Sequence, residues 1–296
     1  MTAIVSDLAV DLAATFTRRL WRLRGVSRAS RAANGFLLGA GAAPMRIAKL
    51  REGTRFRVDL KAKTEWHAFY SGRFDDFWVK TGARLLGAGE SYLDVGANVG
   101  FFSIRVARLR KAPGPVIAFE PVPGNIQRLR ENIALNRVED QVTLMPLGLS
   151  DADAEVCLSL DGSTGGSGTG NAAITDGGDI VARVQKLDDH PELIGDAPVG
   201  VIKVDIEGHE IHFFRGARAT LGRDRPFIIA EVCRDFLRDA GLTAAQVYVD
   251  ALPAGYVLFG EVDGKLVRSS FDALRRLENV LLCPEEKQEL LEQRLK

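Results

Sequence analysis

The sequence has 296 residues, 46% hydrophobic and 26% charged, so it is long enough to bury a sizeable core in one large domain or in one domain with an appendage. Lysine plus arginine and aspartate plus glutamate each number 39, which excludes an overall charge that would attract nucleic acid, and we expect no nucleic-acid partner. Three widely spaced cysteines, no long apolar run and no signal-peptide core argue against a disulfide scaffold and a transmembrane segment, and favour a cytoplasmic location.

The first fifty residues differ from the rest of the chain. Large apolar residues recur there at helical spacing among four arginines, and this pattern predicts a basic amphipathic helix. The helix needs a covering surface, which is its own domain, a sister subunit or a membrane surface. We predict an N-terminal helical extension over 1–52, a main domain over 53–296, and a homo-oligomer formed through the helix. The apolar residues are Leu8, Leu12, Phe16, Leu20 and Leu23.

The middle of the chain alternates strands and helices, as parallel sheets in α/β proteins require. Near the C-terminus two strands follow one another without a full helix, which indicates an antiparallel edge. The sequence thus predicts an α/β, Rossmann-like, mostly parallel seven-stranded sheet with an antiparallel C-terminal edge. After a short strand at 56–60, its strands are expected at 92–95, 116–119, 142–147, 201–204, 227–230, 256–262 and 278–283, with a helix at 101–109, one capped by Asn125, and one with Ile211, Phe214 and Leu221 on one face.

Two segments between these elements have alternative interpretations. Residues 66–78 are rich in aromatic side chains, which either pack in the core or roof a pocket. Residues 161–179 are dense in glycine, serine and threonine, which is typical of a surface loop or of a mobile lid over a substrate.

The first strand of the sheet runs into a glycine loop. Asp94, Gly96, Asn98 and Gly100 lie within seven residues, and ligands of open α/β sheets bind beyond the carboxyl ends of the strands. The glycines permit a tight turn and close approach to a ligand, and the next helix offers its N-terminal amides to a carboxylate. Their four-residue spacing differs from the dinucleotide fingerprint and argues against a nicotinamide-dependent oxidoreductase.

Two later strand ends extend this cofactor site. Glu120 follows the second strand, about twenty residues beyond the loop, where a carboxylate accepts hydrogen bonds from both hydroxyls of an adenosine ribose. Gly148 and Leu149 follow the third strand, where an adenine edge is expected, although a plain turn explains them equally.

The fourth and fifth strands end in a cluster of charged residues. Asp205, Glu207 and His209 follow the fourth strand, and Glu231 ends the fifth, so all four are candidate catalytic residues. Buried charges are costly without partners, and the alternative is a structural pair of Lys203 with Asp205 or Glu231.

These motifs, in this order, resemble the FkbM family of S-adenosylmethionine-dependent methyltransferases over about 56–284. The resemblance implies a class I methyltransferase sheet, S-adenosyl-L-methionine as donor, and usually O-methylation in natural-product or glycan tailoring. The family often has alanine at the position of His209. The cofactor-binding residues are then expected to be Asp94, Gly96, Asn98, Gly100, Glu120, Gly148, Leu149 and Asp205.

The predicted reaction is in-line methyl transfer to a hydroxyl of a small-molecule or glycan acceptor. A sugar hydroxyl is a weak acid, so either His209 or Asp205 accepts its proton, or a divalent cation such as Mg²⁺ held by Asp205 and Glu231 stabilises the alkoxide. The alternatives are a polyketide hydroxyl or a nitrogen as acceptor, and a non-catalytic cofactor-binding scaffold.

Overall fold

The computed structural model describes residues 2–160, 172–174, 178–239, 241, 243–244, 246–275 and 277–296. The chain divides into two compact units. Met1–Asp76 makes up most of the first, here called the N-terminal unit, and the second, the C-terminal unit, comprises Phe77–Ser159 and Ala172–Lys296. Most of the predicted glycine-rich loop, 161–171 and 175–177, lies outside the described residues.

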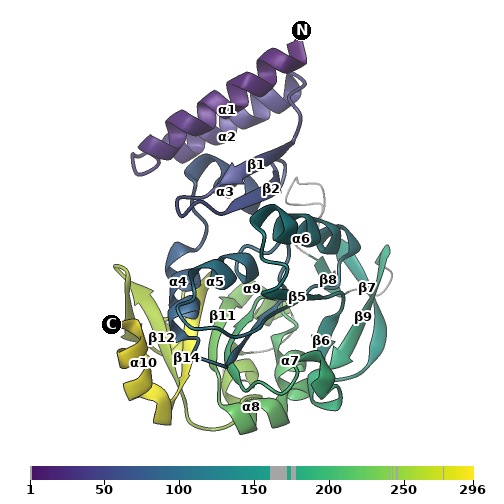
Figure 1. The fold of residues 1–296 in the computed structure, drawn as a ribbon, viewed down its shortest axis with the longest axis vertical. Coiled ribbons are helices and arrows are strands. Elements are labelled where there is room, and N and C mark those ends of the chain that lie inside the picture. The colour runs from purple at the N-terminus through teal and green to yellow at the C-terminus, as the bar shows by residue number, and fades with distance from the viewer. Residues whose placement is uncertain are drawn as a thin grey trace. The chain divides into compact units, whose positions relative to one another are not determined.

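The N-terminal unit combines a helical hairpin with a small antiparallel sheet (Figure 1). Helices α1 (Thr2–Leu20) and α2 (Val26–Gly39) pack together, and β1 (Met45–Lys49) pairs with β2 (Arg55–Asp59). Helix α3 (Lys63–Ser71) packs against both strands and against α1. In the described part of the chain no helix combines the length and hydropathy of a membrane span.

The extension differs from its predicted bounds. The boundary expected after residue 52 falls in the turn between β1 and β2, which pair from Met45↔Asp59 to Lys49↔Arg55, and the unit continues to Asp76. Backbone pairing therefore makes both sides of the predicted boundary one unit. The aromatic segment is also divided, because Trp66, Phe69 and Tyr70 on α3 are buried in this unit, where they pack as core.

The main sheet of the C-terminal unit is the predicted one with an additional strand. Within the described residues its order is β13-β12-β14-β11-β10-β3-β4-β5, with the last five strands parallel and the first three antiparallel at one edge. The eighth strand, β13, follows a tight turn in which Asp263 and Gly264 both have positive φ, as two-residue hairpins require. The strands are β3 (Ser91–Val95), β4 (Val116–Phe119), β5 (Val142–Met145), β10 (Val199–Val204), β11 (Phe227–Cys233), β12 (Tyr256–Val262), β13 (Lys265–Arg268) and β14 (Leu277–Pro284).

Helices cover this sheet, and two of them differ from expectation. The helix expected to carry Ile211, Phe214 and Leu221 is two short helices, which meet at Ala217, although all three side chains are buried as predicted. Asn125 is not a cap, because its helix already begins at Pro123, a residue favoured in the first turn. The helices are α4 (Asp76–Leu85), α5 (Ser103–Leu109), α6 (Pro123–Asn136), α7 (Glu210–Gly216), α8 (Arg218–Asp224), α9 (Arg234–Asp239) and α10 (Gln288–Leu295).

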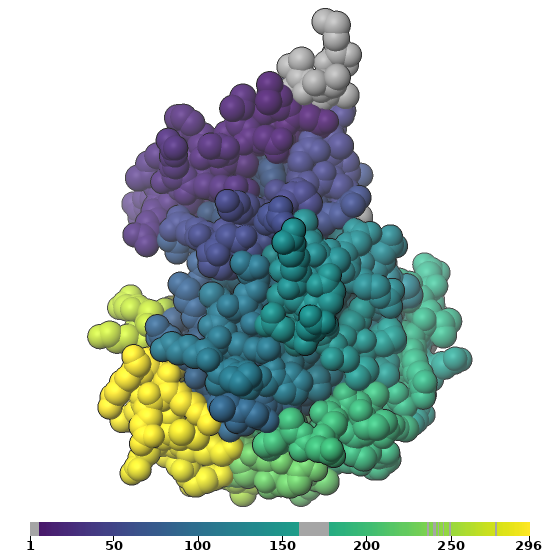
Figure 2. All heavy atoms as spheres, in the orientation of Figure 1, coloured from purple at the N-terminus to yellow at the C-terminus, as the bar shows by residue number. Residues whose placement is uncertain are grey.

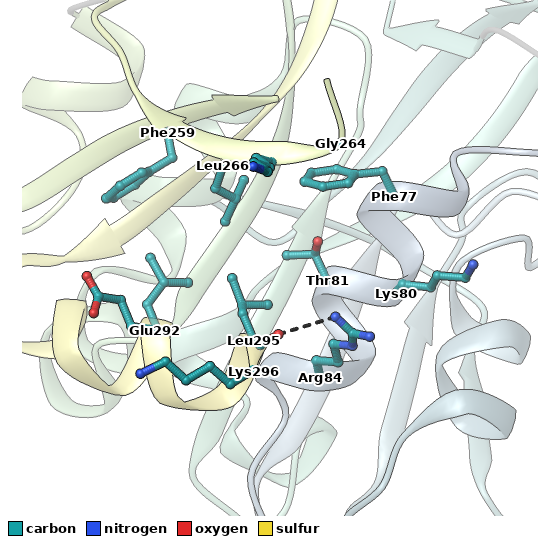
Figure 3. A pocket seen from close by; sticks show the side chains of 12 residues that line it. Phe77, Lys80, Thr81, Arg84, Phe259, Gly264, Leu266, Glu292, Leu295 and Lys296 are labelled. Carbon is teal, nitrogen blue, oxygen red and sulfur yellow. Dashed lines mark hydrogen bonds between the residues drawn. The ribbon is translucent and has the colours of Figure 1, made fainter. Parts of the chain in front are cut away.

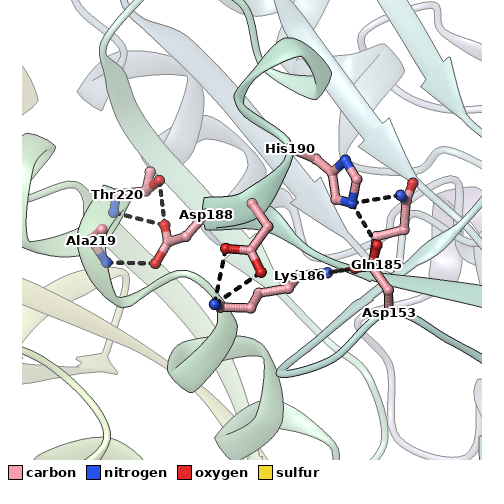
Figure 4. A network of polar contacts seen from close by, with 8 residues as sticks. Asp153, Gln185, Lys186, Asp188, His190, Ala219 and Thr220 are labelled. Atoms are coloured by element: carbon pink, nitrogen blue, oxygen red, sulfur yellow. Dashed lines mark hydrogen bonds and ion pairs between the residues drawn. The ribbon is translucent and has the colours of Figure 1, made fainter.

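A second sheet, which the sequence did not predict, follows β5. Its described strands are β6 (Gly148–Ser150), β9 (Ile180–Lys186), β7 (Ala154–Leu160) and β8 (Ala172–Ile174), in that order. Asp188, just after β9, accepts hydrogen bonds from the backbone amides of Ala219 at 2.6 Å and Thr220 at 2.9 Å, so it caps α8 (Figure 4). This contact joins the second sheet to the helix that packs beside β10.

Candidate active site

Strand register brings the predicted site residues to one edge of the main sheet. Val95 pairs with Val204, and Val204 pairs with Ala230, so Gly96, Asp205 and Glu231 each follow a residue in the same row. Since β3, β10 and β11 are parallel, this row lies at their carboxyl ends, where α/β proteins bind ligands. The structure therefore brings the glycine loop and two of the acids together, as predicted.

The glycines of the loop are required by contacts with the protein's own chain. At Gly96, where φ is 83°, a Cβ atom would lie 2.0 Å from the backbone oxygen of Asp205. At Gly100, where φ is 92°, it would lie 2.4 Å from Cδ1 of Leu129. The amides of Gly96 and Ala97 both donate to the backbone oxygen of Phe119. The loop is thus packed between β4, α6 and the end of β10, which explains the glycines without the close ligand approach that we predicted.

Asp94 anchors the helix that follows the loop. Its side chain is 2% exposed, and Oδ2 accepts hydrogen bonds from the backbone amide of Ser103 at 2.8 Å and from the Ser103 hydroxyl. Burial raises the pKa of Asp94 to about 6, while Ser103 and Lys203 oppose that increase. Its observed role is to hold the start of α5, and its predicted contact with a cofactor stays a prediction.

Glu120 joins the glycine loop to the end of β4. Its Oε2 atom accepts a hydrogen bond from the Asn98 amide at 2.8 Å, and its Oε1 atom accepts from the Val122 amide at 2.9 Å and from Nδ2 of Asn125 at 3.3 Å. Glu120 is 4% exposed, and burial raises its pKa to about 7. Asn98, which this bond holds, has a left-handed φ of 50°.

Asn125 is a further candidate that the sequence interpretation missed. Its side chain is buried beside Glu120, and within the described part of the chain its Oδ1 atom accepts no hydrogen bond. A buried acceptor without a donor is unfavourable, so this oxygen suits a hydroxyl donor from a ligand. Its only sequence signal was its position five residues after Glu120, which we had interpreted as a helix cap.

The two residues expected beside adenine lie in the second sheet, on β6. Leu149 is 3% exposed and packs in the hydrophobic core. Gly148 is half-buried, and a Cβ atom added at this position would lie 3.2 Å from Cγ1 of Val184. Any contact of this strand with a ligand therefore falls on Gly148 and on the backbone.

Asp205 is paired with a buried lysine. The Nζ atom of Lys203 lies 3.4 Å from Oδ2 of Asp205, donates to the backbone oxygen of Val204 at 3.1 Å, and lies over the ring of Phe102. Lys203 is 1% exposed, whereas the Asp205 side chain is 36% exposed. The alternative of a structural Lys203–Asp205 pair is thus observed, and part of the carboxylate remains exposed to solvent.

His209 contacts a different set of residues from Asp205. Its Nε2 atom lies 2.9 Å from Oγ of Ser150, and its ring stacks on His212 with centroids 4.3 Å apart. The Nδ1 atom of His212 in turn lies 2.8 Å from Oδ2 of Asp151. Burial, assisted by the neighbouring His212, lowers the pKa of His209 to about 4. His209 is thus already engaged by Ser150 and His212, whereas part of the Asp205 carboxylate is exposed, and this difference favours Asp205 as the proton acceptor.

The two remaining candidates are Glu207, in the turn before α7, and Glu231, near the end of β11. Glu207 has a left-handed φ of 52° and is followed by Gly208 at 96°, so the chain turns sharply into α7. Glu231 is half-buried on β11, and its backbone oxygen accepts a hydrogen bond from Tyr248 at 3.2 Å. Within the described residues, no three or more His, Cys, Asp or Glu side chains are grouped to hold a metal ion.

A cavity of about 550 Å³ in the C-terminal unit lies apart from these residues (Figure 3). It is lined by α4, the β12–β13 hairpin and α10, including Phe77, Phe259 and Leu266. Arg84 crosses it to donate to the backbone oxygen of Leu295 at 3.3 Å. None of the predicted site residues lines this cavity, so it is not the predicted cofactor site.

Comparisons with curated proteins give two short matches. Hexuronic acid methyltransferase AglP of Haloferax volcanii is 29% identical over 140 residues, which are 47% of this chain and 54% of AglP. AMB antimetabolite synthetase AmbE of Pseudomonas aeruginosa is 46% identical over 63 residues, 21% of this chain and 3% of AmbE. The chain thus spans about half the length of one relative and a small part of the other.

Solved structures with a similar arrangement include the methyltransferase FkbM from Methylobacillus flagellatus, with a TM-score of 0.45 and 19% identity over 67% of this chain and 44% of that one. The O-methyltransferase from Bacillus cereus, in complex with SAH, has a TM-score of 0.42 and 15% identity over 70% and 78% of the two chains. A family model described as the methyltransferase FkbM domain matches residues 94–275, which is more than half of the chain and holds the glycine loop, Glu120, Asp205 and Glu231. The chain therefore belongs to the FkbM family of methyltransferases.

Proposed function

We propose that the protein is an S-adenosylmethionine-dependent O-methyltransferase whose acceptor is a hydroxyl of a sugar or a glycosylated natural product. The observation that carries this proposal is the placement of buried Glu120 and Asn125 beside a glycine loop that contacts Asp205. Membership of a methyltransferase family supports the reaction type, and the name of AglP supports a sugar acid as acceptor. A balanced net charge agrees with a small-molecule acceptor rather than nucleic acid, and we place the reaction in the cytoplasm.

The residues present fit the donor. A carboxylate accepts about four hydrogen bonds, and Glu120 receives three from the described chain, which leaves capacity for one ribose hydroxyl. The buried Oδ1 of Asn125 suits the other hydroxyl. Glu120 and Asn125 would thus hold the ribose, while Gly148 and the loop backbone from Gly96 to Gly100 would contact the rest of the molecule.

Asp205 is the residue that accepts the proton. When bound, S-adenosylmethionine would supply an electrophilic methyl group for in-line transfer, in which the sulfur–methyl bond breaks and the sulfur leaves as a neutral thioether. The acceptor hydroxyl donates a hydrogen bond to the exposed side of the Asp205 carboxylate and transfers its proton there as the new bond forms. Lys203 contacts the other side of that carboxylate and fixes its orientation. Asp205 then returns the proton to water.

The donor set fits a divalent cation less well. A cation held by Asp205 and Glu231 needs the Asp205 oxygens, but the ammonium of Lys203 already lies 3.4 Å from one of them and repels a second positive charge. The reaction is therefore expected to proceed at an unchanged rate when a chelator is added, and an activity that requires Mg²⁺ would contradict this assignment.

Calorimetric titration of S-adenosylmethionine into the purified protein tests the donor. We expect binding by the wild type and by Glu155→Ala, an exposed carboxylate on β7, and at least about tenfold weaker binding by Glu120→Ala. Equal binding by all three would remove Glu120 from the site. No binding by the wild type, or a nicotinamide absorbance in the purified protein, would overturn the proposal in favour of a scaffold or an oxidoreductase.

Transfer of labelled methyl groups then tests the acceptor. Uronic acids and oligosaccharides that contain them are compared with aglycone polyketides and with amines. We expect product only with a sugar hydroxyl, and the same sugar with that hydroxyl removed serves as the control. If product forms with an amine or an aglycone and none forms with sugars, the protein is still a methyltransferase, but the proposed sugar acceptor is wrong.

A further inference from the structure

A stripe of large apolar side chains runs along the exposed face of α1. The atoms of this helix, in dark purple, lie on the surface of the N-terminal unit (Figure 2). Leu8, Leu12 and Phe16 are spaced by four residues, so they share one face of the helix, and they are 62%, 62% and 71% exposed. Val10 and Ala14, on the opposite face, are buried at 0% and 2% exposed. The internal packing of α1 thus uses its small residues and leaves its largest ones in solvent.

The stripe extends beyond these three residues. Leu20 is 36% exposed, Leu23 is 59% exposed, and Phe36 on the neighbouring α2 is 76% exposed. Of the eleven large hydrophobic side chains exposed in the described chain, these six fall between residues 8 and 36. Scattered exposed apolar residues need no explanation, but a gathering of this kind marks an interaction surface. We call these six residues the apolar stripe.

Positive charge gathers at one end of the apolar stripe. Residues 1–44 contain six arginines and two aspartates, a formal charge of +4, although the whole chain is neutral. Arg19, Arg22 and Arg24 are exposed near the end of α1. One of the aspartates, Asp7, is already bound to the side chain of Arg46 and to the amide of Ala43. The surface around the apolar stripe therefore has more cations than anions to pair with them.

This charge selects among the three surfaces that can cover an amphipathic helix. A second copy placed face to face would bring two such cationic regions together, with the carboxylate of Asp11 as the main counter-charge from each helix. An anionic lipid surface offers apolar chains to the leucines and phenylalanines and phosphates to the arginines. We propose that the apolar stripe and its arginines dock the protein on an anionic membrane surface, with α1 parallel to that surface. This inference does not depend on the proposed methyl transfer.

Vesicle sedimentation with the full chain tests the proposal. The wild type is mixed with vesicles of phosphatidylcholine alone or of phosphatidylcholine with phosphatidylglycerol, at low and high salt. We expect binding to the anionic vesicles only, weakened by salt. Leu12→Gln combined with Phe16→Gln is expected to reduce binding at least about tenfold. Val181→Gln is the matched control, because Val181 is a 62% exposed apolar residue on β9, and it is expected to bind normally.

The charge is tested separately. Arg19→Gln and Arg22→Gln are each expected to weaken binding about fivefold, whereas Arg130→Gln, an exposed arginine on α6, is expected to have no effect. Circular dichroism confirms that each variant is folded. The proposal is overturned if the wild type fails to bind anionic vesicles or binds neutral ones equally well. It is also overturned if light scattering shows a dimer that Leu12→Gln with Phe16→Gln dissociates, since a second copy then covers the apolar stripe.

Discussion

The two halves of the candidate site hold their acidic residues in different ways. On the donor side, at the ends of β3 and β4, Asp94 and Glu120 are 2% and 4% exposed and are bonded mainly by backbone amides. On the acceptor side, at the ends of β10 and β11, Asp205 and Glu231 are partly exposed, and Asp205 is paired with a side chain. Asp205, although held by the buried Lys203, is therefore more open to solvent than Asp94 or Glu120. The difference agrees with the proposed roles, a bound donor held by buried acids and an acceptor that meets an exposed carboxylate.

The strongest test of this comparison is Asp205→Asn. The amide keeps the size of the carboxylate but cannot accept the proton, so we expect kcat to fall by about 10²–10⁴ while S-adenosylmethionine binding changes little. His209→Ala is the comparison variant, and it is expected to lower kcat by less than about tenfold because the Nε2 atom of His209 is already held by the Ser150 hydroxyl. Steady-state rates and calorimetry measure both effects. The reverse ranking would make His209 the base.

The rigidity of the donor side is tested by Gly96→Ala. Its Cβ atom would lie 2.0 Å from the Asp205 backbone oxygen, which cannot move without disturbing β10, so we expect a loss of about 3–5 kcal/mol in the free energy of unfolding. Gly89→Ala is a matched control, since Gly89 also has a positive φ, of 76°, but has no atom within 4 Å of the added carbon. It should lose only about 1–2 kcal/mol. Equal losses in urea unfolding would show that the close contact is not the cause.

Burial of the donor-side acids predicts a pH dependence. The pKa of Glu120 is raised to about 7, so the folded chain holds this proton more tightly than the unfolded one. Its contribution to stability is therefore full below about pH 4.5 and is lost as pH rises toward 7. Relative to Glu120→Gln, the wild type should lose about 3 kcal/mol over this range. Urea unfolding at several pH values measures the difference, and parallel curves for the two proteins would refute the prediction.

The smallest expected effect is on the stability of α8, which Asp188 next to the second sheet caps. Asp188→Ala removes the cap of α8, a helix that packs beside β10, and should cost about 1–2 kcal/mol. Asp189→Ala removes a neighbouring carboxylate whose partner is the side chain of Lys186, and should cost less than about 1 kcal/mol. Thermal unfolding compares the two variants. A larger loss in Asp189→Ala would show that capping does not hold α8.

Much of the main sheet was predictable because its signals are local. Buried parallel strands are short apolar runs, and the glycine loop and Glu120 follow two of them directly. The row of Gly96, Asp205 and Glu231 then follows from the rule that parallel strands end at one edge. Family membership and the α/β fold were therefore correctly predicted, with β13 as an additional edge strand.

What the sequence did not predict depends on distant partners. The contact of His209 with Ser150 spans 59 positions, and periodicity does not indicate which segment packs against which. The second sheet was missed because β7 and β9 pair across the glycine-rich segment that separates them in the sequence. The boundary at residue 52 differs from the observed unit because the pairing of β1 with β2 leaves no compositional mark. The buried Asn125 oxygen, which accepts no hydrogen bond in the described chain, was not predictable for the same reason, because the burial of a polar atom depends on tertiary structure.

The contact between Gly96 and the backbone of Asp205 has a consequence for protein engineering. Because the two segments touch with no room for a methyl group, the loop and Asp205, the proposed proton acceptor, cannot be altered independently. A library of variants that randomises either segment is expected to impair both of the proposed functions, donor binding and proton transfer. New acceptor preferences are better sought among exposed residues that touch neither segment, so that the chemistry is inherited intact while the choice of substrate changes.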